Sequence, residues 1–325
     1  MSEEVIRFKC EVCGSSLNVS PEDIVSICKY CGGLNSVSRV ISRDDIYVVP
    51  SVDEGKIIEE FWRRVRGDID LRKIAEKIRI KSIQGWYIPY WISRVEVEGV
   101  VIYTKKEHNG KHVKIIKKKE KFSRALDMHV VGRRQMKNVG VGELINAYFK
   151  HKAETVGIRD LDEGWWRSNK LNFLNIEFDR DEAAIMIRED AVDFIRKKWE
   201  DMADEIKFFK AEILNMEKPK LVLLPLWEVI YEYRGSLYFA YHEGWSGSSL
   251  IFAEPMTVGR RFLYLAGMIS SVVGGMLIGI IFSTASYNGS DYTSILILLF
   301  FFITFLGYRF AKKFISDVRV EKSWR

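Results

Sequence analysis

The sequence lacks the short motifs that mark several common classes of enzyme. It contains no H-E-x-x-H, no G-x-G-x-x-G and no phosphate-binding G-x4-G-K-[ST]. The stretch Gly244-Trp245-Ser246-Gly247 is not a nucleophile elbow, because Ser248 stands where the pattern G-x-S-x-G requires a glycine. None of these four reaction classes is therefore indicated.

Histidine is scarce and scattered. The chain has five histidines, at His108, His112, His129, His151 and His242. The first two flank a predicted hairpin, where exposure to solvent is the default. Acidic residues are plentiful on the predicted helices, but their pairs have the spacing of solvated faces. With neither a motif nor a cluster of titratable side chains, the sequence predicts a protein that is not an enzyme.

A secretion signal is also lacking. Residues 1–9 are charged and contain no apolar core of the kind that signal peptides carry. We therefore expect the large N-terminal part of the chain in the cytoplasm. The formal net charge is +6, which is basic without being extreme. A basic cytoplasmic face beside a membrane would suit anionic headgroups, and it would also suit nucleic acid.

Cysteine is confined to one short N-terminal segment, residues 1–40. The four cysteines form two pairs with C-x2-C spacing, Cys10 with Cys13 and Cys28 with Cys31. A glycine follows the second cysteine of each pair and permits the tight turn that aims both sulfurs at one ion. This pattern is typical of a zinc ribbon with four thiolate ligands in a closed, tetrahedral site.

Other chemistries of four cysteines compete with zinc. A rubredoxin-like iron site uses the same ligands. Two disulfides are disfavoured by the expected cytoplasmic location, and a thioredoxin-like pair needs a strand-to-helix context that is missing here. We therefore predict one structural Zn²⁺, with iron as the less favoured metal. The segment has little apolar content, so the metal would supply most of its folding free energy.

Two long apolar runs lie near the C-terminus, at residues 262–283 and 292–309, on either side of a short polar break. The first has about the 20 residues that a helix needs to cross a bilayer, and the second is near the lower limit. Together they predict a transmembrane helical hairpin over residues 260–313. A buried helical hairpin in a soluble domain is the alternative, and the cationic flanks of the two runs disfavour it.

The charges around the hairpin predict its orientation. The loop over residues 287–293 carries no lysine or arginine, whereas both outer ends are flanked by cations: Arg260, Arg261, Arg309, Lys312 and Lys313. The positive-inside bias therefore places both termini, including the tail at residues 314–325, in the cytoplasm, as in a two-pass cell-membrane protein. Asn288 begins an N-glycosylation sequon in the outer loop, and whether it is modified stays open.

The first apolar run carries a stripe of small residues. Gly267, Ser271, Gly275 and Gly279 recur at every fourth position, which lets another helix approach closely. We expect the second helix to cover this stripe through its phenylalanines at positions 300–302. Packing against a second copy of the chain, giving a homo-oligomer, is the alternative.

The region between ribbon and hairpin, residues 46–255, has the pattern of an α+β domain with antiparallel sheets. Hydrophobic spacing predicts helices over residues 51–66, 68–78, 139–148 and 181–205. It predicts strands over residues 86–103, 112–124, 128–134, 206–216, 220–233, 237–242 and 248–253. Asn109-Gly110 is a strong hairpin signal, and Gln84-Gly85 is expected to break the chain. Trp165 and Trp166 are expected in the core, with the bilayer interface as the alternative.

A short motif, P-x-W-x7-G, occurs twice in this region, from Pro89 to Gly99 and from Pro225 to Gly235. It suggests a duplication, with two similar units over about residues 46–135 and 180–255. The prolines should open a strand or lie at a sheet edge. The tryptophans of the motif, Trp91 and Trp227, are expected to be core residues.

A run of lysines follows the predicted hairpin turn, at Lys114, Lys117, Lys118, Lys119 and Lys121. An ordinary solvated strand face, which also protects an edge from aggregation, is the favoured interpretation. Contact with phosphate or lipid headgroups is the alternative, and nucleic acid would bind through the same charges.

These motifs together resemble a family of uncharacterised prokaryotic membrane proteins that join a zinc ribbon to a cytoplasmic domain and C-terminal transmembrane helices. Their ribbons are labelled TFIIB-type or primosomal-helicase-like. The similarity rests on the four cysteines, on Tyr87-Ile88-Pro89-Tyr90-Trp91 and on Leu224-Pro225-Leu226-Trp227. The segment from Tyr238 to Pro255 also matches, except that His242-Glu243-Gly244-Trp245 replaces the usual Asn-Gly turn. The resemblance implies an architecture and no activity.

The sequence therefore predicts a membrane-anchored zinc protein that acts as a cytoplasmic adaptor for an unidentified protein partner. A membrane-tethered nucleic-acid binder, which would use the ribbon and the lysine-rich hairpin, is the alternative. An enzyme or assembly factor whose site is formed only by the fold is the third hypothesis.

Overall fold

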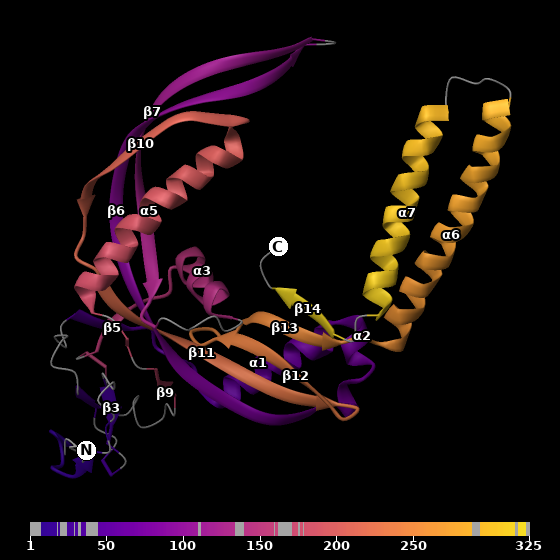
Figure 1. Ribbon diagram of the computed structural model, residues 1–325. Coiled ribbons are helices and arrows are strands. Elements are labelled where there is room, and N and C mark those ends of the chain that lie inside the picture. The colour runs from indigo at the N-terminus through magenta and orange to yellow at the C-terminus, as the bar shows by residue number, and fades with distance from the viewer. Residues whose placement is uncertain are drawn as a thin grey trace, which may run out of the picture. The chain divides into compact units, whose positions relative to one another are not determined.

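The computed structural model forms two compact units, one of Met1–Ile57, Gln84–Trp227 and Glu243–Ser248, the other of Ile58–Ile83, Glu228–His242 and Ser249–Arg325. Figure 1 shows the elements along the chain. The described residues are 8–17, 19, 25–28, 30–31, 34–36, 45–109, 112–133, 140–158, 160–161, 171–174, 176–177, 179–287, 293–315 and 318–322. Asn288, Trp165 and Trp166 lie outside them, so the predictions made for these residues stay predictions.

The fold is mixed α+β with a large sheet, as the sequence predicted. The helices are α1 (Glu54–Gly67), α2 (Ile69–Arg72), α3 (Val141–His151), α5 (Arg180–Met202), α6 (Val258–Tyr287) and α7 (Thr293–Ile315). The larger strands are β6 (Arg79–Asn109), β7 (His112–Val131), β10 (Glu205–Met216), β11 (Lys220–Tyr233), β12 (Ser236–Glu243), β13 (Ser249–Pro255) and β14 (Val318–Lys322). Hydrogen-bonded neighbours follow the order β10-β6-β11-β12-β13-β14.

Three long antiparallel strands dominate the first unit. β6 pairs with β7 from Tyr90↔Val131 out to Asn109↔His112, which confirms the predicted hairpin. On its other side β6 pairs with β10, and that pairing ends at Thr104↔Glu205. The predicted strand at residues 128–134 is not separate, because β7 continues to Val131. Beyond Thr104 no third strand among the described residues pairs with the hairpin, which is a two-stranded arm there (Figure 1).

Helix α5 covers one face of these strands (Figure 1). It begins with a capping box, in which the Asp179 carboxylate accepts from backbone N–H groups and Glu182 bonds back to the Asp179 N–H. Its buried side chains recur at every fourth residue: Ala183, Ile187, Ala191, Ile195 and Trp199. Phe194 and Met202 of the same helix are exposed. Only the row of residues that faces the sheet is covered.

The predicted break at Gln84-Gly85 and the expected edge positions of the prolines were wrong. β6 begins at Arg79 and runs through Gly85, where a Cβ atom would lie 3.0 Å from the ring of Trp227. Glycine is therefore required there by close packing and not by a turn. Pro89 also lies inside β6, and its carbonyl accepts from the Gly132 N–H at 2.8 Å.

Both tryptophans of the P-x-W-x7-G motif are buried, as predicted. The Trp227 indole donates to the Ser51 hydroxyl at 2.9 Å. The final glycines differ, because Gly99 lies within β6, where a Cβ would meet the Lys210 carbonyl, whereas Gly235 turns the chain with φ +79°. The duplication inferred from this motif therefore stays a prediction.

Aromatic side chains form the core of the second unit. The ring of Phe61 on α1 packs on Tyr231 of β11 and Phe252 of β13, with centroids 5.2 and 5.5 Å apart. The Tyr231 hydroxyl donates to the Ala253 carbonyl.

The helix predicted over residues 68–78 is much shorter, since α2 ends at Arg72 and one 3-10 turn follows.

The C-terminal tail contains a strand that the sequence did not predict. β14 pairs antiparallel with β13, and Pro255, the last residue of β13, lies opposite Val318, the first residue of β14. Helices α6 and α7 occupy the chain between these two strands. The helical hairpin is therefore inserted where a β-hairpin would have its turn.

Candidate metal centre and apolar helical hairpin

Two small hairpins build the metal centre. β1 (Phe8–Lys9) pairs with β2 (Ser16–Leu17), and β3 (Val25–Ile27) pairs with β4 (Leu34–Ser36). Each pair of cysteines lies in the turn of one hairpin. The buried core of this segment consists of Cys10, Leu17 and Cys28. With so little apolar surface to bury, the two hairpins depend on a cross-link for stability.

The structure brings the four sulfur atoms together. All four Sγ atoms lie within 4.8 Å of one another, with Cys10 to Cys31 at 3.5 Å and Cys13 to Cys28 at 3.7 Å. A tetrahedral zinc ion with Zn–S bonds of about 2.3 Å would separate its sulfurs by about 3.8 Å. The described cysteines are free thiols. The cluster fits one metal ion held by four thiolates, with no further ligand position.

The first cysteine turn shows why this sequence can form the cluster. The Gly14 N–H donates to the Cys10 carbonyl at 2.8 Å, and the Cys10 N–H donates to the Ser15 carbonyl at 2.7 Å. Gly14 adopts φ +71°, a left-handed conformation that glycine accepts without strain. The predicted role of glycine after Cys13 is therefore confirmed in this turn.

Two polar side chains support the thiolates, and neither was predicted from the sequence. The Ser15 hydroxyl lies 2.9 Å from the Cys28 sulfur and 3.1 Å from the Cys13 sulfur. The buried Asn35 amide lies 3.5 Å from the Cys10 sulfur, and its oxygen accepts from the Glu11 N–H at 2.8 Å. Asn35 thereby joins the second hairpin to the first turn.

The same contacts favour the ionised sulfurs. The Ser15 hydroxyl, followed by the backbone N–H of Cys31, lowers the pKa of Cys28 to about 6. Burial acts to raise the pKa of Cys10, but N–H groups in its own turn outweigh burial and lower that pKa overall. Thiolates are the form that binds metal, so the site is prepared for a soft cation.

Replacing Ser15 tests this supporting role. We expect Ser15→Ala to weaken zinc binding about tenfold, because hydrogen bonds from outside the ligand shell orient and stabilise the ligands. Competition with a chromophoric chelator measures the affinity. Ser16→Ala is the matched control, since Ser16 is the next residue and is exposed. Equal affinities for the two variants would contradict the role assigned to Ser15.

The tips of the two cysteine turns are apolar and exposed. Val12 lies between Cys10 and Cys13 and is 53% exposed. Tyr30 lies between Cys28 and Cys31 and is 81% exposed. Both turns therefore hold one apolar side chain in contact with solvent, at corresponding positions.

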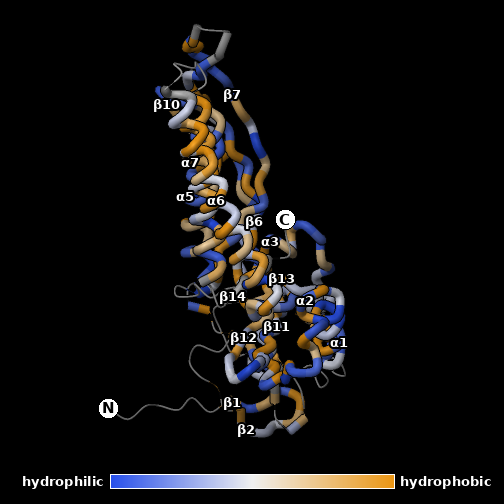
Figure 2. Tube along the Cα trace, turned by 90° about the vertical axis from the view of Figure 1, so that its right-hand side faces the viewer, coloured by the Kyte–Doolittle hydropathy of each residue, from blue (hydrophilic) through white to orange (hydrophobic). Residues whose placement is uncertain are grey.

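The chain also has two helices long and apolar enough to cross a membrane, Val258–Thr284 with 27 residues and Ser294–Phe314 with 21. At 1.5 Å per residue they span about 40 and 31 Å, against an apolar bilayer thickness of about 30 Å. In the most apolar stretch of 18 residues of each helix, only 6% and 0% of the residues are buried by the described part of the chain. Figure 2 shows the hydrophobic residues along α6 and α7. A core hairpin of a soluble domain would be covered.

Much of the small-residue stripe of α6 faces α7. A Cβ at Gly267 would lie 3.1 Å from the Phe310 ring, and one at Gly307 would lie 3.0 Å from Ser271. Gly275 approaches Phe300 at 3.7 Å. Around Gly279, no described atom lies within 4 Å of a Cβ position. The stripe therefore serves packing within the chain at three of its four positions, and a homo-oligomer stays a prediction.

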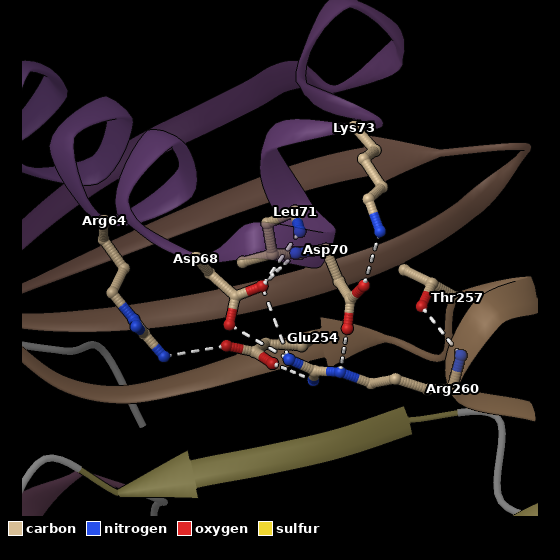
Figure 3. A network of polar contacts seen from close by, with 8 residues as sticks. All are labelled: Arg64, Asp68, Asp70, Leu71, Lys73, Glu254, Thr257 and Arg260. Atoms are coloured by element: carbon tan, nitrogen blue, oxygen red, sulfur yellow. Dashed lines mark hydrogen bonds and ion pairs between the residues drawn. The ribbon is translucent and has the colours of Figure 1, made fainter. Parts of the chain in front are cut away.

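A network of ion pairs connects the first residues of α6 to the start of α2 and to β13 (Figure 3). The Arg260 guanidinium contacts Asp68 at 3.0 Å, Asp70 at 2.5 Å and Glu254 at 2.9 Å. Glu254 is 0% exposed, and its carboxylate also forms an ion pair with Arg64 at 2.8 Å. The sequence places Arg260 among the cations that flank the first apolar run, and the structure surrounds it with three carboxylates.

Strand geometry divides the lysine run between two faces. Alternation places Lys117, Lys119 and Lys121 on one face of β7, and Lys114 and Lys118 on the other. The second face is the one that α5 covers, since Phe122 and Tyr103 contact Trp199 there, with ring centroids 6.0 and 5.4 Å apart. The five lysines therefore do not form one patch.

Fold and site define a class: a mixed α+β protein with a four-cysteine cluster that fits a metal ion and two helices apolar enough to cross a membrane. Comparison of the chain with protein-family models, with curated proteins and with solved structures gave no match. The argument for function therefore rests on the geometry of these sites.

Proposed function

We propose that this protein is a membrane-anchored zinc protein whose ribbon holds a partner protein at the cytoplasmic surface of the membrane. The single observation that carries the proposal is the exposure of Val12 and Tyr30 at the tips of a closed four-thiolate cluster. A metal with four protein ligands has no position for a substrate, so it acts by holding these tips in place. Iron is the alternative metal for the same ligands.

The insertion of the hairpin between β13 and β14 supports a two-pass topology. Because these strands are paired neighbours, the start of α6 and the end of α7 must lie on the same side of the bilayer. Arg309, Lys312 and Lys313 follow the second apolar run, which favours the cytoplasmic side. We propose that both termini are cytoplasmic and that the chain belongs to the family of zinc-ribbon membrane proteins that it resembles.

Crosslinking in intact cells tests the proposal. A photoreactive amino acid introduced at Val12 or Tyr30 is expected to capture the same protein repeatedly. Capture is expected to disappear when Cys28→Ser removes a metal ligand, because the turns then lose their fixed positions. Mass spectrometry identifies what is captured.

The matched control places the photoreactive residue at Ile185, an apolar residue that is exposed on α5, far along the chain from the ribbon. Equal capture at this position would show that any exposed apolar residue suffices, and would refute the proposal. Recovery of nucleic acid in place of protein at Val12 and Tyr30 would favour the membrane-tethered nucleic-acid binder instead.

A further inference from the structure

The face of the β6-β7-β10 sheet that α5 leaves uncovered combines cations with apolar side chains. We call it the open face. On β7 it carries Val113, Ile115, Lys117, Lys119 and Lys121, all of which are exposed. Alternation along the strand puts these five residues on the same side, opposite to the side that contacts α5. Figure 2 shows the hydrophilic and hydrophobic residues along this strand.

The neighbouring strands β6 and β10 also place apolar side chains and lysines on the open face. The registers place Ile102 of β6 opposite Lys119 of β7 and opposite Phe208 of β10. A hollow of about 660 Å³ lies among these residues and is also lined by Lys121 and Lys210. Phe208 is 49% exposed at its rim. The open face is therefore a shallow apolar surface bordered by ammonium groups.

The charge of this face is divided along its length. Toward the hairpin turn the registers place Lys106, Lys117, Lys119 and Lys121 on it with one acidic residue, Glu205, which pairs with Lys207. Farther from the turn it carries Lys210 and Arg94 together with Glu96, Glu98, Asp127 and Glu212. Glu212 is paired with Lys210 at 2.6 Å. Among the described residues, none forms a salt bridge with Lys117, Lys119 or Lys121. Protection of an edge strand would explain the lysines, but it would not explain exposed Val113 and Ile115 beside them, at 54% and 63%.

We infer that the open face binds the surface of an anionic phospholipid bilayer. Lysine is a compact charge on a long apolar stem, so Lys117, Lys119 and Lys121 can reach headgroup phosphates while Val113 and Ile115 enter the interfacial layer. Nucleic acid fits less well, because its phosphate backbone offers nothing to exposed aliphatic side chains. This contact is independent of the ribbon and of the apolar helices.

Vesicle binding by the full chain tests the inference. The protein is held in nanodiscs of phosphatidylcholine, which accommodate α6 and α7, and is mixed with separate vesicles. Co-sedimentation is expected with vesicles containing phosphatidylglycerol and not with pure phosphatidylcholine. Replacing Lys117, Lys119 and Lys121 together by Gln is expected to weaken binding at least about tenfold. Ile115→Asn is expected to weaken it without changing the charge.

The control replaces Lys150, Lys197 and Lys198 by Gln, which gives the same change of charge on helices α3 and α5. Wild-type binding is expected for this control. Equal loss in both triple variants, full binding by the first variant, or absence of wild-type binding would overturn the inference. So would tighter binding of a DNA oligonucleotide that depends on the same three lysines. Unchanged thermal stability and zinc content establish that the variants are folded.

Discussion

Removing the metal is expected to unfold the ribbon and to leave the rest of the protein folded. Binding of structural zinc by such segments contributes about 10–16 kcal/mol at pH 7, and the apolar core around Leu17 is too small to replace it. Cys28→Ser removes one ligand at nearly constant volume. Metal analysis of protein purified without chelator should find about one zinc per wild-type chain and almost none in the variant.

Hydrogen exchange locates the unfolding. The Gly14 and Cys10 amides, which donate within the first turn, should lose protection in Cys28→Ser or after treatment with chelator. Amides of α5 serve as the internal control and should keep their protection. Adding zinc back to chelated wild type should restore the ribbon. Finding neither zinc nor iron in wild-type protein, or a chelated ribbon with full protection, would contradict the metal centre.

Replacing Glu254 by Gln is expected to lower the free energy of unfolding by about 3 kcal/mol, because it leaves two arginines beside a buried position without their shared carboxylate. Glu254 is fully buried and forms ion pairs with Arg64 and Arg260. Urea-induced unfolding in mild detergent measures the change. The loss should also loosen the junction after β13, which proteolysis between Pro255 and Val258 would detect.

The control for this prediction is Glu205→Gln. Glu205 pairs with Lys207 at 2.5 Å, but both side chains are largely exposed, and such pairs contribute about 1 kcal/mol or less. If Glu254→Gln were no more destabilising than Glu205→Gln, the network would not fix the start of α6.

Acid should weaken the same network. Burial acts to raise the pKa of Asp68, but the N–H groups of Leu71 and Asp70 and the charge of Arg260 outweigh it and lower that pKa below 3.8. A carboxyl group with a lowered pKa in the folded state contributes stability above its ordinary pKa. That contribution should disappear as the pH falls below about 4.

Hydrophobic spacing in the sequence predicted helices and strands correctly where one face of the element is buried. α5 and the strands from β10 to β13 follow their hydrophobic spacing closely. The pattern failed where packing takes priority over local preference. Gly85 and Pro89 look like breaks, yet both lie inside β6, where Gly85 is packed against the ring of Trp227 and the Pro89 carbonyl accepts from the Gly132 N–H.

By itself, the sequence determined the four-cysteine cluster and the two apolar helices. The spacing of the cysteines is sufficient to predict the first, and the length of the apolar runs is sufficient to predict the second. Only tertiary structure placed Ser15 and Asn35 beside the sulfurs, since a hydrogen bond between distant residues leaves no local pattern. The same holds for Arg260, which the sequence offers as a free cation and folding surrounds with carboxylates. A charge is defined by its residue, but its partners are defined only by the fold.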